Sequence, residues 1–316
     1  MRLDELPLWF LRGVAIPFGL IWGSFLNVVI YRVPREMSVV NPPSHCPGCG
    51  KPVKPYDNVP VLSYLILRGR ARCCGVKMSP RYVVVELLGG LLSLAVLEVI
   101  VRSLPGDTSA VRASAVYLAD FALCLGLLAA AFIDAEHMYL PDPITIGGTV
   151  LGIGTASLHD LGYVESITGA VAGYLIVWLP FIVLYKALRG RAGMGLGDAK
   201  LLALAGAWFG WPGALFTLFA GALQGTVGAL FIYLVRGKID EPESVTADRE
   251  ELQRLADEGD DEAKQILKDD PVGSEPEEGL GKARMPFGPF LILACLELLF
   301  ARDRIFSTLM RWLSPD

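Results

Sequence analysis

Long apolar runs recur along the whole chain and restrict what it can fold into. Runs near or above about 20 residues can cross the hydrocarbon core of a bilayer as helices. Eight membrane segments can be drawn, of which the fourth and sixth are short, at residues 8–30, 82–101, 113–133, 144–158, 167–188, 199–211, 214–235 and 287–301. The hydrophobic fraction of 53% and the mean hydropathy of +0.47 exceed those of typical soluble domains. The sequence therefore predicts an all-α, polytopic membrane helix bundle of about eight transmembrane helices.

The polar segments divide the chain and orient it. Lys and Arg are concentrated in segments 31–81 and 186–200, whereas the connections 159–165 and 211–213 contain neither. By the positive-inside rule the basic segments are cytoplasmic. An acidic stretch at 240–278 supplies the formal net charge of −5. We expect a first membrane helix in 1–30, a cytoplasmic cysteine-containing domain in 31–81, a membrane core in 82–235, an acidic cytoplasmic insert in 236–285, and a last membrane helix with a tail in 286–316.

Two aspartates lie where apolar segments end or begin, and an ionisable residue in such a place indicates a function. Asp134 ends the third predicted helix and Asp198 begins the sixth, so both fall at the cytoplasmic end. Two carboxylates in one dry site share a proton. The ionised member can take a proton from water while the protonated member polarises a peptide carbonyl, as in aspartic proteases. The alternatives are a proton relay in a transporter and a turn in which Asp198 caps a helix.

Further polar residues accompany Asp198 in the sequence. Gly195 and Gly197 carry no Cβ, so an extended substrate backbone could pass close to Asp198. Lys200 follows in the same loop. Asp142 precedes the fourth predicted helix, where we expect it to cap the helix or shape the loop. These four residues are predicted to support the aspartate pair.

Four of the six cysteines lie in segment 31–81: Cys46, Cys49, Cys73 and Cys74. A Cys-x-x-Cys pair followed by further cysteines resembles a tetrahedral zinc knuckle. A short polar domain with little apolar content would be stabilised by a bound metal. The cytoplasmic location argues against disulfides. The remaining cysteines lie in apolar runs and are expected to be core residues.

Motifs along nearly the whole chain carry a resemblance to a known family. They are Gly23-Ser24-Phe25-Leu26-Asn27-Val28-Val29, His45-Cys46-Pro47-Gly48-Cys49, Asn58-Val59-Pro60, Leu67-Arg68-Gly69, Ser79-Pro80-Arg81-Tyr82, Val85-Glu86-Leu87, Ile133-Asp134, Leu140-Pro141-Asp142, Gly193 to Lys200, and Pro286-Phe287-Gly288-Pro289. With these motifs the chain resembles the bacterial type IV prepilin peptidases. Those enzymes are bifunctional leader peptidases and N-methyltransferases of type IV pilus and type II secretion systems, with Gly-x-Gly-Asp intramembrane aspartic protease chemistry.

The resemblance implies that Asp134 and Asp198 are the catalytic pair of an aspartic endopeptidase. Its substrates would be prepilins and pseudopilins, cut at the cytoplasmic face of the bacterial inner membrane. The new N-terminal residue would then be methylated from S-adenosylmethionine, for which the sequence identifies no binding residues. Segment 31–81 would be associated with methyl transfer and segment 82–235 with proteolysis. Besides its substrates, we expect membrane lipid as a partner and no nucleic acid.

The cysteine pattern departs from that of the family, which has two Cys-x-x-Cys pairs. Aligning Cys74 with the last family cysteine places Ala71 at the third position. Cys73 could replace the missing thiol, although adjacent cysteines rarely fit one tetrahedral site without strain, and His45 is a further candidate. The prediction is a structural zinc ion with Cys46, Cys49, Cys73 and Cys74 as its ligands.

Overall fold

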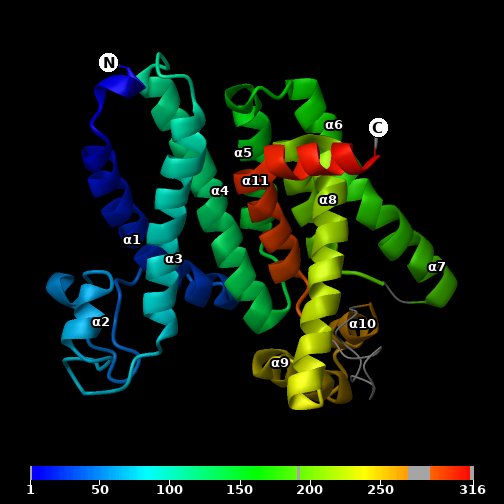
Figure 1. Cartoon of the computed structure of the whole chain (residues 1–316). Coiled ribbons are helices and arrows are strands. Elements are labelled where there is room, and N and C mark those ends of the chain that lie inside the picture. The colour runs from blue at the N-terminus through cyan, green and yellow to red at the C-terminus, as the bar shows by residue number, and fades with distance from the viewer. Residues whose placement is uncertain (1, 191–192, 270–284, 314–316) are drawn as a thin grey trace. The chain divides into compact units, whose positions relative to one another are not determined.

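The computed structural model of the chain describes residues 2–190, 193–269 and 285–313. These residues form helices joined by loops, with isolated bridges and no strand (Figure 1). The predicted all-α class is therefore confirmed. The chain divides into two compact units, Met1–Ala129 and Ala130–Asp316. The division into functional segments made from the sequence stays a prediction.

The N-terminal unit is built from two long helices, the first part of a third, and the cysteine-containing loop. Its α-helices are α1 (Leu8–Arg32), α2 (Leu62–Ile66), α3 (Arg81–Ala95) and the start of α4 (Ala110–His137). Its short helices are η1 (Leu3–Glu5), η2 (Val33–Arg35), η3 (Pro55–Asp57), η4 (Val96–Ile100) and η5 (Val101–Ser103). Because η4 and η5 continue α3 without a break in the chain, the apolar helix extends to Ser103.

Glycines bring α1 and α3 into backbone contact, and the two helices lie side by side in Figure 1. A Cβ added to Gly19 would lie 2.5 Å from the carbonyl oxygen of Gly89. About two turns further along α1, the Nδ2 of Asn27 donates to the carbonyl of Tyr82 at 3.1 Å. Small residues and interhelical hydrogen bonds are what hold apolar helices together in lipid, where the hydrophobic effect between helices is absent.

The C-terminal unit is organised around α8 (Leu196–Arg236). Its other elements are the end of α4, α5 (Asp142–Thr155), η6 (Ala156–His159), α6 (Tyr163–Val177), η7 (Trp178–Leu184), α7 (Tyr185–Arg189), α9 (Glu243–Asp257), α10 (Asp261–Asp269) and α11 (Gly288–Leu313). Helices α5, α6 and α11 all pack on α8 (Figure 1). Helix α8, whose first turn contains Asp198, is therefore held by three neighbouring helices.

The closest packing in this unit is between α6 and α8. A Cβ on Gly169 would collide with the carbonyl oxygen of Gly206, and a Cβ on Gly206 would collide with that of Gly169. Beside this contact the Ser166 hydroxyl donates to the carbonyl of Ala207 at 2.7 Å. The buried hydroxyl is thereby hydrogen-bonded, as a buried polar group must be to avoid a desolvation cost.

Five helical stretches of the described chain are long and apolar enough to cross a membrane: Leu8–Arg35, Arg81–Ser103, Ala110–His137, Tyr163–Arg189 and Leu196–Arg236. The predicted eight crossings are not confirmed. Helix α5 has 14 residues and so extends only about 21 Å. Helix α8 merges the two segments predicted at 199–211 and 214–235, but it breaks at Gly210, where φ is 71° and ψ is 177°. Helix α11 also breaks, at Ala301, where the last predicted segment ends.

The contact between α6 and α8 predicts a sharp difference between two glycine substitutions. Gly169→Ala should lower the stability of the protein by about 1–3 kcal/mol, because the methyl group overpacks the helix contact. Gly154→Ala is the matched control, since nothing lies within 4 Å of the added methyl. Thermal unfolding in detergent would measure both, and equal melting temperatures would contradict the inferred contact.

Candidate active site and metal centre

Asp134 lies one turn before the end of α4 and is buried, with 5% of its surface exposed. The backbone N–H of Gly288, the first residue of α11, donates to its Oδ2 at 2.9 Å. A Cβ on Gly288 would lie 2.6 Å from the same oxygen. Glycine at this position therefore allows the start of α11 to approach the carboxylate and hydrogen-bond to it.

Asp198 is the third residue of α8, and Gly195 is the N-cap. The backbone of Gly195 hydrogen-bonds to the Asp198 carboxylate. A carboxylate in the first turn of a helix is favoured by the helix dipole and by the unpaired N–H groups there. Asp198 thus stabilises the helix start from inside the first turn, and not from the N-cap position considered in the sequence.

Asp134 and Asp198 belong to one compact unit. Leu140 connects their surroundings. A Cβ on Gly197 would lie 3.0 Å from Leu140 Cβ, and one on Gly288 would lie 3.1 Å from Leu140 Cδ2. The two segments that carry or orient the carboxylates therefore meet at one buried apolar side chain, which limits the access of water to the pair.

The four residues predicted to support the aspartate pair make different contacts. The ammonium of Lys200 forms an ion pair with Asp142 Oδ1 at 2.5 Å, which joins the first turn of α8 to the first residue of α5. Because Gly197 has no Cβ, Leu140 packs against it, so this side of Gly197 is filled by the protein itself and not by a substrate. At Gly195 an added Cβ would meet only Asp198, at 3.5 Å, and the adjacent backbone. Of the two glycines, Gly195 alone has the open side that close passage of a substrate backbone requires.

Two contacts of this site were not inferred from the sequence. One is the Gly288 N–H, although its Pro-Phe-Gly-Pro motif was noted. The other involves α9 in the acidic insert: the Ser244 hydroxyl donates to the carbonyl of Glu136, two residues after Asp134. A buried ion pair between Arg249 and Glu241, 2.6 Å apart, ties α9 to the segment that precedes it. The remainder of the insert, 270–284, lies outside the described residues.

The cysteine-containing loop consists of two turns with the same backbone pattern. In the first, the N–H of Cys46 donates to Lys51 O at 2.8 Å and the N–H of Gly50 donates to Cys46 O at 2.9 Å. In the second, Ala71 donates to Val76 O at 2.9 Å and Gly75 donates to Ala71 O at 2.8 Å. Both glycines have a positive φ, 69° and 72°. Ala71 therefore occupies the place of Cys46 in the second turn, as the sequence alignment suggested.

The four predicted sulfurs nevertheless come together. The Sγ atoms of Cys46, Cys49, Cys73 and Cys74 all lie within 4.8 Å of one another. Cys46 and Cys74 are 3.6 Å apart, and Cys49 and Cys73 are 3.3 Å apart. A tetrahedral ion with metal–sulfur bonds of about 2.3 Å needs sulfurs about 3.8 Å apart. Cys73 thus supplies the thiol that Ala71 lacks, and the cluster could bind a metal. His45 is outside it, with its Nδ1 3.4 Å from the carbonyl of Pro43.

The thiols of this cluster differ in acidity. The pKa of Cys46 is lowered to about 7, chiefly because the backbone of Gly48 hydrogen-bonds to its sulfur. The pKa of Cys73 is raised to about 12 by its hydrogen bonds with Cys49 and Cys46. One thiolate among neighbouring thiols favours a soft divalent cation, which binds with release of the remaining protons.

One unit carries two aspartates at the ends of apolar helices, and the other carries a thiol cluster. These features indicate a multi-pass helical membrane protein with the groups of an aspartic hydrolase. Comparison with known families agrees. The chain matches the bacterial peptidase A24 N-terminal domain over residues 17–100 and the type IV leader peptidase family over residues 121–230. The chain belongs to the type IV leader peptidase family.

Curated relatives support this assignment over most of their length. A prepilin leader peptidase/N-methyltransferase from Neisseria gonorrhoeae is 35% identical over 252 residues, covering 71% of this chain and 83% of the relative. Proteins of the same name from Burkholderia pseudomallei (strain 1026b) and Myxococcus xanthus (strain DK1622) are each 36% identical. Their alignments cover 75% and 89% of this chain, and 82% and 87% of the relatives. No solved structure matches the chain significantly.

The repeated turn predicts that a cysteine introduced at residue 71 can replace Cys73 as a metal ligand. Cys73→Ala should weaken zinc binding by at least about ten-fold, because three thiolates remain. Adding Ala71→Cys should restore one zinc ion per chain, since this residue occupies the place of Cys46 in the repeated turn. Zinc content after dialysis against a chelator would measure both. Cys295→Ala, a buried cysteine of the other unit, is the control, and full zinc in Cys73→Ala would contradict the assignment.

Proposed function

We propose that this chain is the aspartic endopeptidase that removes the leader from type IV prepilins and pseudopilins, with Asp134 and Asp198 as its catalytic residues. The observation that carries the proposal is that the segments next to the two carboxylates both contact Leu140, while Asp134 accepts a buried backbone N–H from Gly288. The names of the relatives supply the substrate class. A transporter or proton relay, the alternative raised by the sequence, has no support among these relatives.

The mechanism follows from the carboxylate pair. When the two carboxylates share one proton, the ionised carboxylate takes a proton from a water molecule. The oxygen of that water molecule attacks the scissile carbonyl carbon. The protonated carboxylate donates to the carbonyl oxygen and stabilises the charge that develops there. The Gly288 N–H keeps Asp134 in one orientation, so little reorganisation is needed. Lys200 and Asp142 fix the first turn of α8 relative to α5 and act as positioning residues.

The place of cleavage follows from topology. The basic residues of segments 31–81 and 186–200 put those segments in the cytoplasm, and both aspartates lie next to cytoplasmic segments in this arrangement. The membrane is the bacterial inner membrane, and membrane lipid is the surrounding partner. A substrate helix in the bilayer would then present its polar junction to the aspartates at the cytoplasmic face.

The second activity is N-methylation of the new N-terminal residue, with S-adenosylmethionine as donor, as the names of the relatives suggest. The four-cysteine cluster would hold a structural zinc ion, which would stabilise a loop that has little apolar core of its own. A cluster with four thiol ligands leaves no open coordination position for a reacting group, which favours a structural role.

Single replacements of the aspartates test the proposed function. Asp134→Asn and Asp198→Asn should each reduce prepilin cleavage by about 10²–10⁴-fold, because neither amide can exchange the required proton. Asp160→Asn is the control: this residue is exposed, has φ of 54°, and asparagine accepts that conformation. Cleavage of a purified prepilin, followed by mass measurement, provides the readout. Normal cleavage by either active-site variant would refute the catalytic assignment.

The hydrogen bond to Asp134 gives a second test. Gly288→Ala should reduce the rate of cleavage by at least about ten-fold, because the added methyl would displace either the carboxylate or α11. Gly225→Ala is a matched control on α8, where the added Cβ would make an ordinary contact of 3.5 Å with Phe287. We expect the substitution at Gly288 to lower kcat more than it changes KM. A loss confined to thermal stability would indicate a structural role only.

A further inference from the structure

Helix η7, two elements before α8, departs from α-helical hydrogen bonding. It is a π-helical segment, Trp178–Leu184, and it contains Pro180. Proline has no N–H, and its ring collides with the carbonyl of the residue four positions earlier, so a helix must widen or bend around it. All seven residues of η7 are described, and none of them is buried. Core packing therefore does not account for the irregular turn, and turns of this kind occur often at functional sites.

The widened turn releases one carbonyl from the hydrogen bond that an α-helix would give it. In an α-helix the N–H of Tyr185 would donate to the carbonyl of Phe181, four residues earlier. Here that N–H donates instead to the carbonyls of Pro180 and Ile182. The Phe181 carbonyl accepts from the N–H of Gly193 at 2.8 Å. The helix thus directs one of its own acceptors to the loop that precedes α8.

Gly193 fits closely against the same segment. A Cβ at this position would lie 3.0 Å from the ring of Tyr185 and 3.2 Å from the carbonyl oxygen of Phe181. Contacts this short require a neighbour to move, so glycine is the residue that lets the loop approach the helix. Two residues later, Gly195 is the N-cap of α8, and its backbone hydrogen-bonds to the Asp198 carboxylate. Hydrogen bonds and a short stretch of chain therefore connect η7 to Asp198.

We propose that Phe181 and Gly193 are positioning residues for Asp198, and that Pro180 creates the contact between them. This inference rests on the proposed peptidase function. The bond from Gly193 to η7 fixes the loop two residues before the N-cap of α8, and so holds the Asp198 carboxylate where it acts together with Asp134. A displacement of about 1 Å in a reacting group can lower a rate about 10²-fold. Loss of this bond therefore affects the chemical step and not the binding of substrate.

Pro180→Ala tests the proposal, because alanine supplies the N–H that proline lacks and allows the segment to resume α-helical bonding. The N–H of Tyr185 would then take the Phe181 carbonyl from Gly193. We expect kcat for prepilin cleavage to fall at least ten-fold with KM little changed, while the melting temperature in detergent stays the same or rises. Pro17→Ala, the same change inside α1 of the other unit, should leave cleavage unchanged. Unchanged cleavage by Pro180→Ala, or a loss of cleavage with a lower melting temperature, would overturn the proposal.

A second set of variants tests Gly193 directly. Gly193→Ala should reduce kcat at least ten-fold, because the added methyl must displace Tyr185 or the loop. Adding Tyr185→Ala removes the ring and should raise the rate at least three-fold above that of the single variant. Gly147→Ala on α5, where nothing lies within 4 Å of the added methyl, is the control. Full activity of Gly193→Ala, or no recovery in the double variant, would contradict the positioning role.

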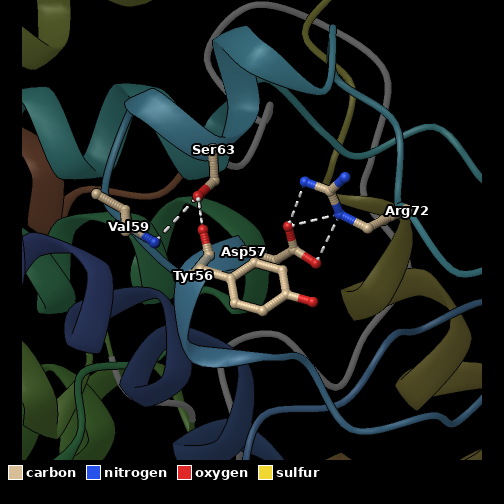
Figure 2. A network of polar contacts seen from close by, with 5 residues as sticks. All are labelled: Tyr56, Asp57, Val59, Ser63 and Arg72. Carbon is tan, nitrogen blue, oxygen red and sulfur yellow. Dashed lines mark hydrogen bonds and ion pairs between the residues drawn. The ribbon is translucent and has the colours of Figure 1, made fainter.

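A polar network in the N-terminal unit supplies a control for stability, as Figure 2 shows. Arg72 forms an ion pair with Asp57 at 2.8 Å. Beside it, the Ser63 hydroxyl donates to the carbonyl of Tyr56 at 3.2 Å and accepts from the N–H of Val59 at 3.0 Å. Asp57→Ala removes the ion pair, so it should lower the melting temperature and leave kcat unchanged. A ten-fold loss of kcat in this variant would show that cleavage follows stability alone, and would overturn the proposal.

Exchange of the Gly193 amide proton, followed by NMR on protein labelled at glycine, needs no substrate. It should be at least ten-fold faster in Pro180→Ala than in the unchanged protein, because the amide loses its acceptor; equal exchange would overturn the proposal. The cleavage assays separate this inference from the proposed function. Normal cleavage by Pro180→Ala with an inactive Asp198→Asn would refute the positioning role alone, whereas normal cleavage by Asp198→Asn would refute both.

Discussion

A carboxylate at the end of an apolar helix cannot be buried without a hydrogen-bond partner, and this constraint governs the active site. Asp134 obtains its partner from the backbone N–H of Gly288, 154 residues away in the sequence. The bond requires α11 to begin against the end of α4, and it requires that residue 288 have no side chain. A single buried donor thus fixes the start of α11 and the orientation of one oxygen of the proposed catalytic pair.

Close helix packing makes that arrangement possible. Helix α8 carries Asp198, and α5, α6 and α11 surround it. Gly169 and Gly206 allow α6 to touch α8 backbone to backbone, and the Trp208 indole donates to the carbonyl of Gly148 on α5 at 2.9 Å. Contacts of this kind act over short distances, so a small shift of α8 would break several at once. The position of Asp198 therefore depends on the contacts that α8 makes with α5 and α6.

The sequence predicts what depends on local signals. Apolar length predicted the helices, and the aspartates at their ends predicted the proposed site. The boundary predicted between segments 199–211 and 214–235 lies two residues after the observed break at Gly210. The number of crossings could not be predicted, because apolar length alone does not decide whether a short helix such as α5 spans the bilayer. The Gly288 N–H has no side-chain signature, and its contact joins distant segments. The position of the Cys73 sulfur likewise required the folded turn, since spacing alone left Ala71 where a ligand was expected.

The two reactions proposed for this chain, peptide cleavage and N-methylation, must occur in a fixed order. The amine that receives the methyl group does not exist until the peptide bond is hydrolysed, because the nitrogen is an amide before cleavage and its lone pair is delocalised into the carbonyl. Afterwards it is an α-amine with a pKa of about 8, and a fraction is neutral and nucleophilic near neutral pH. Cleavage must therefore precede methylation for each substrate molecule.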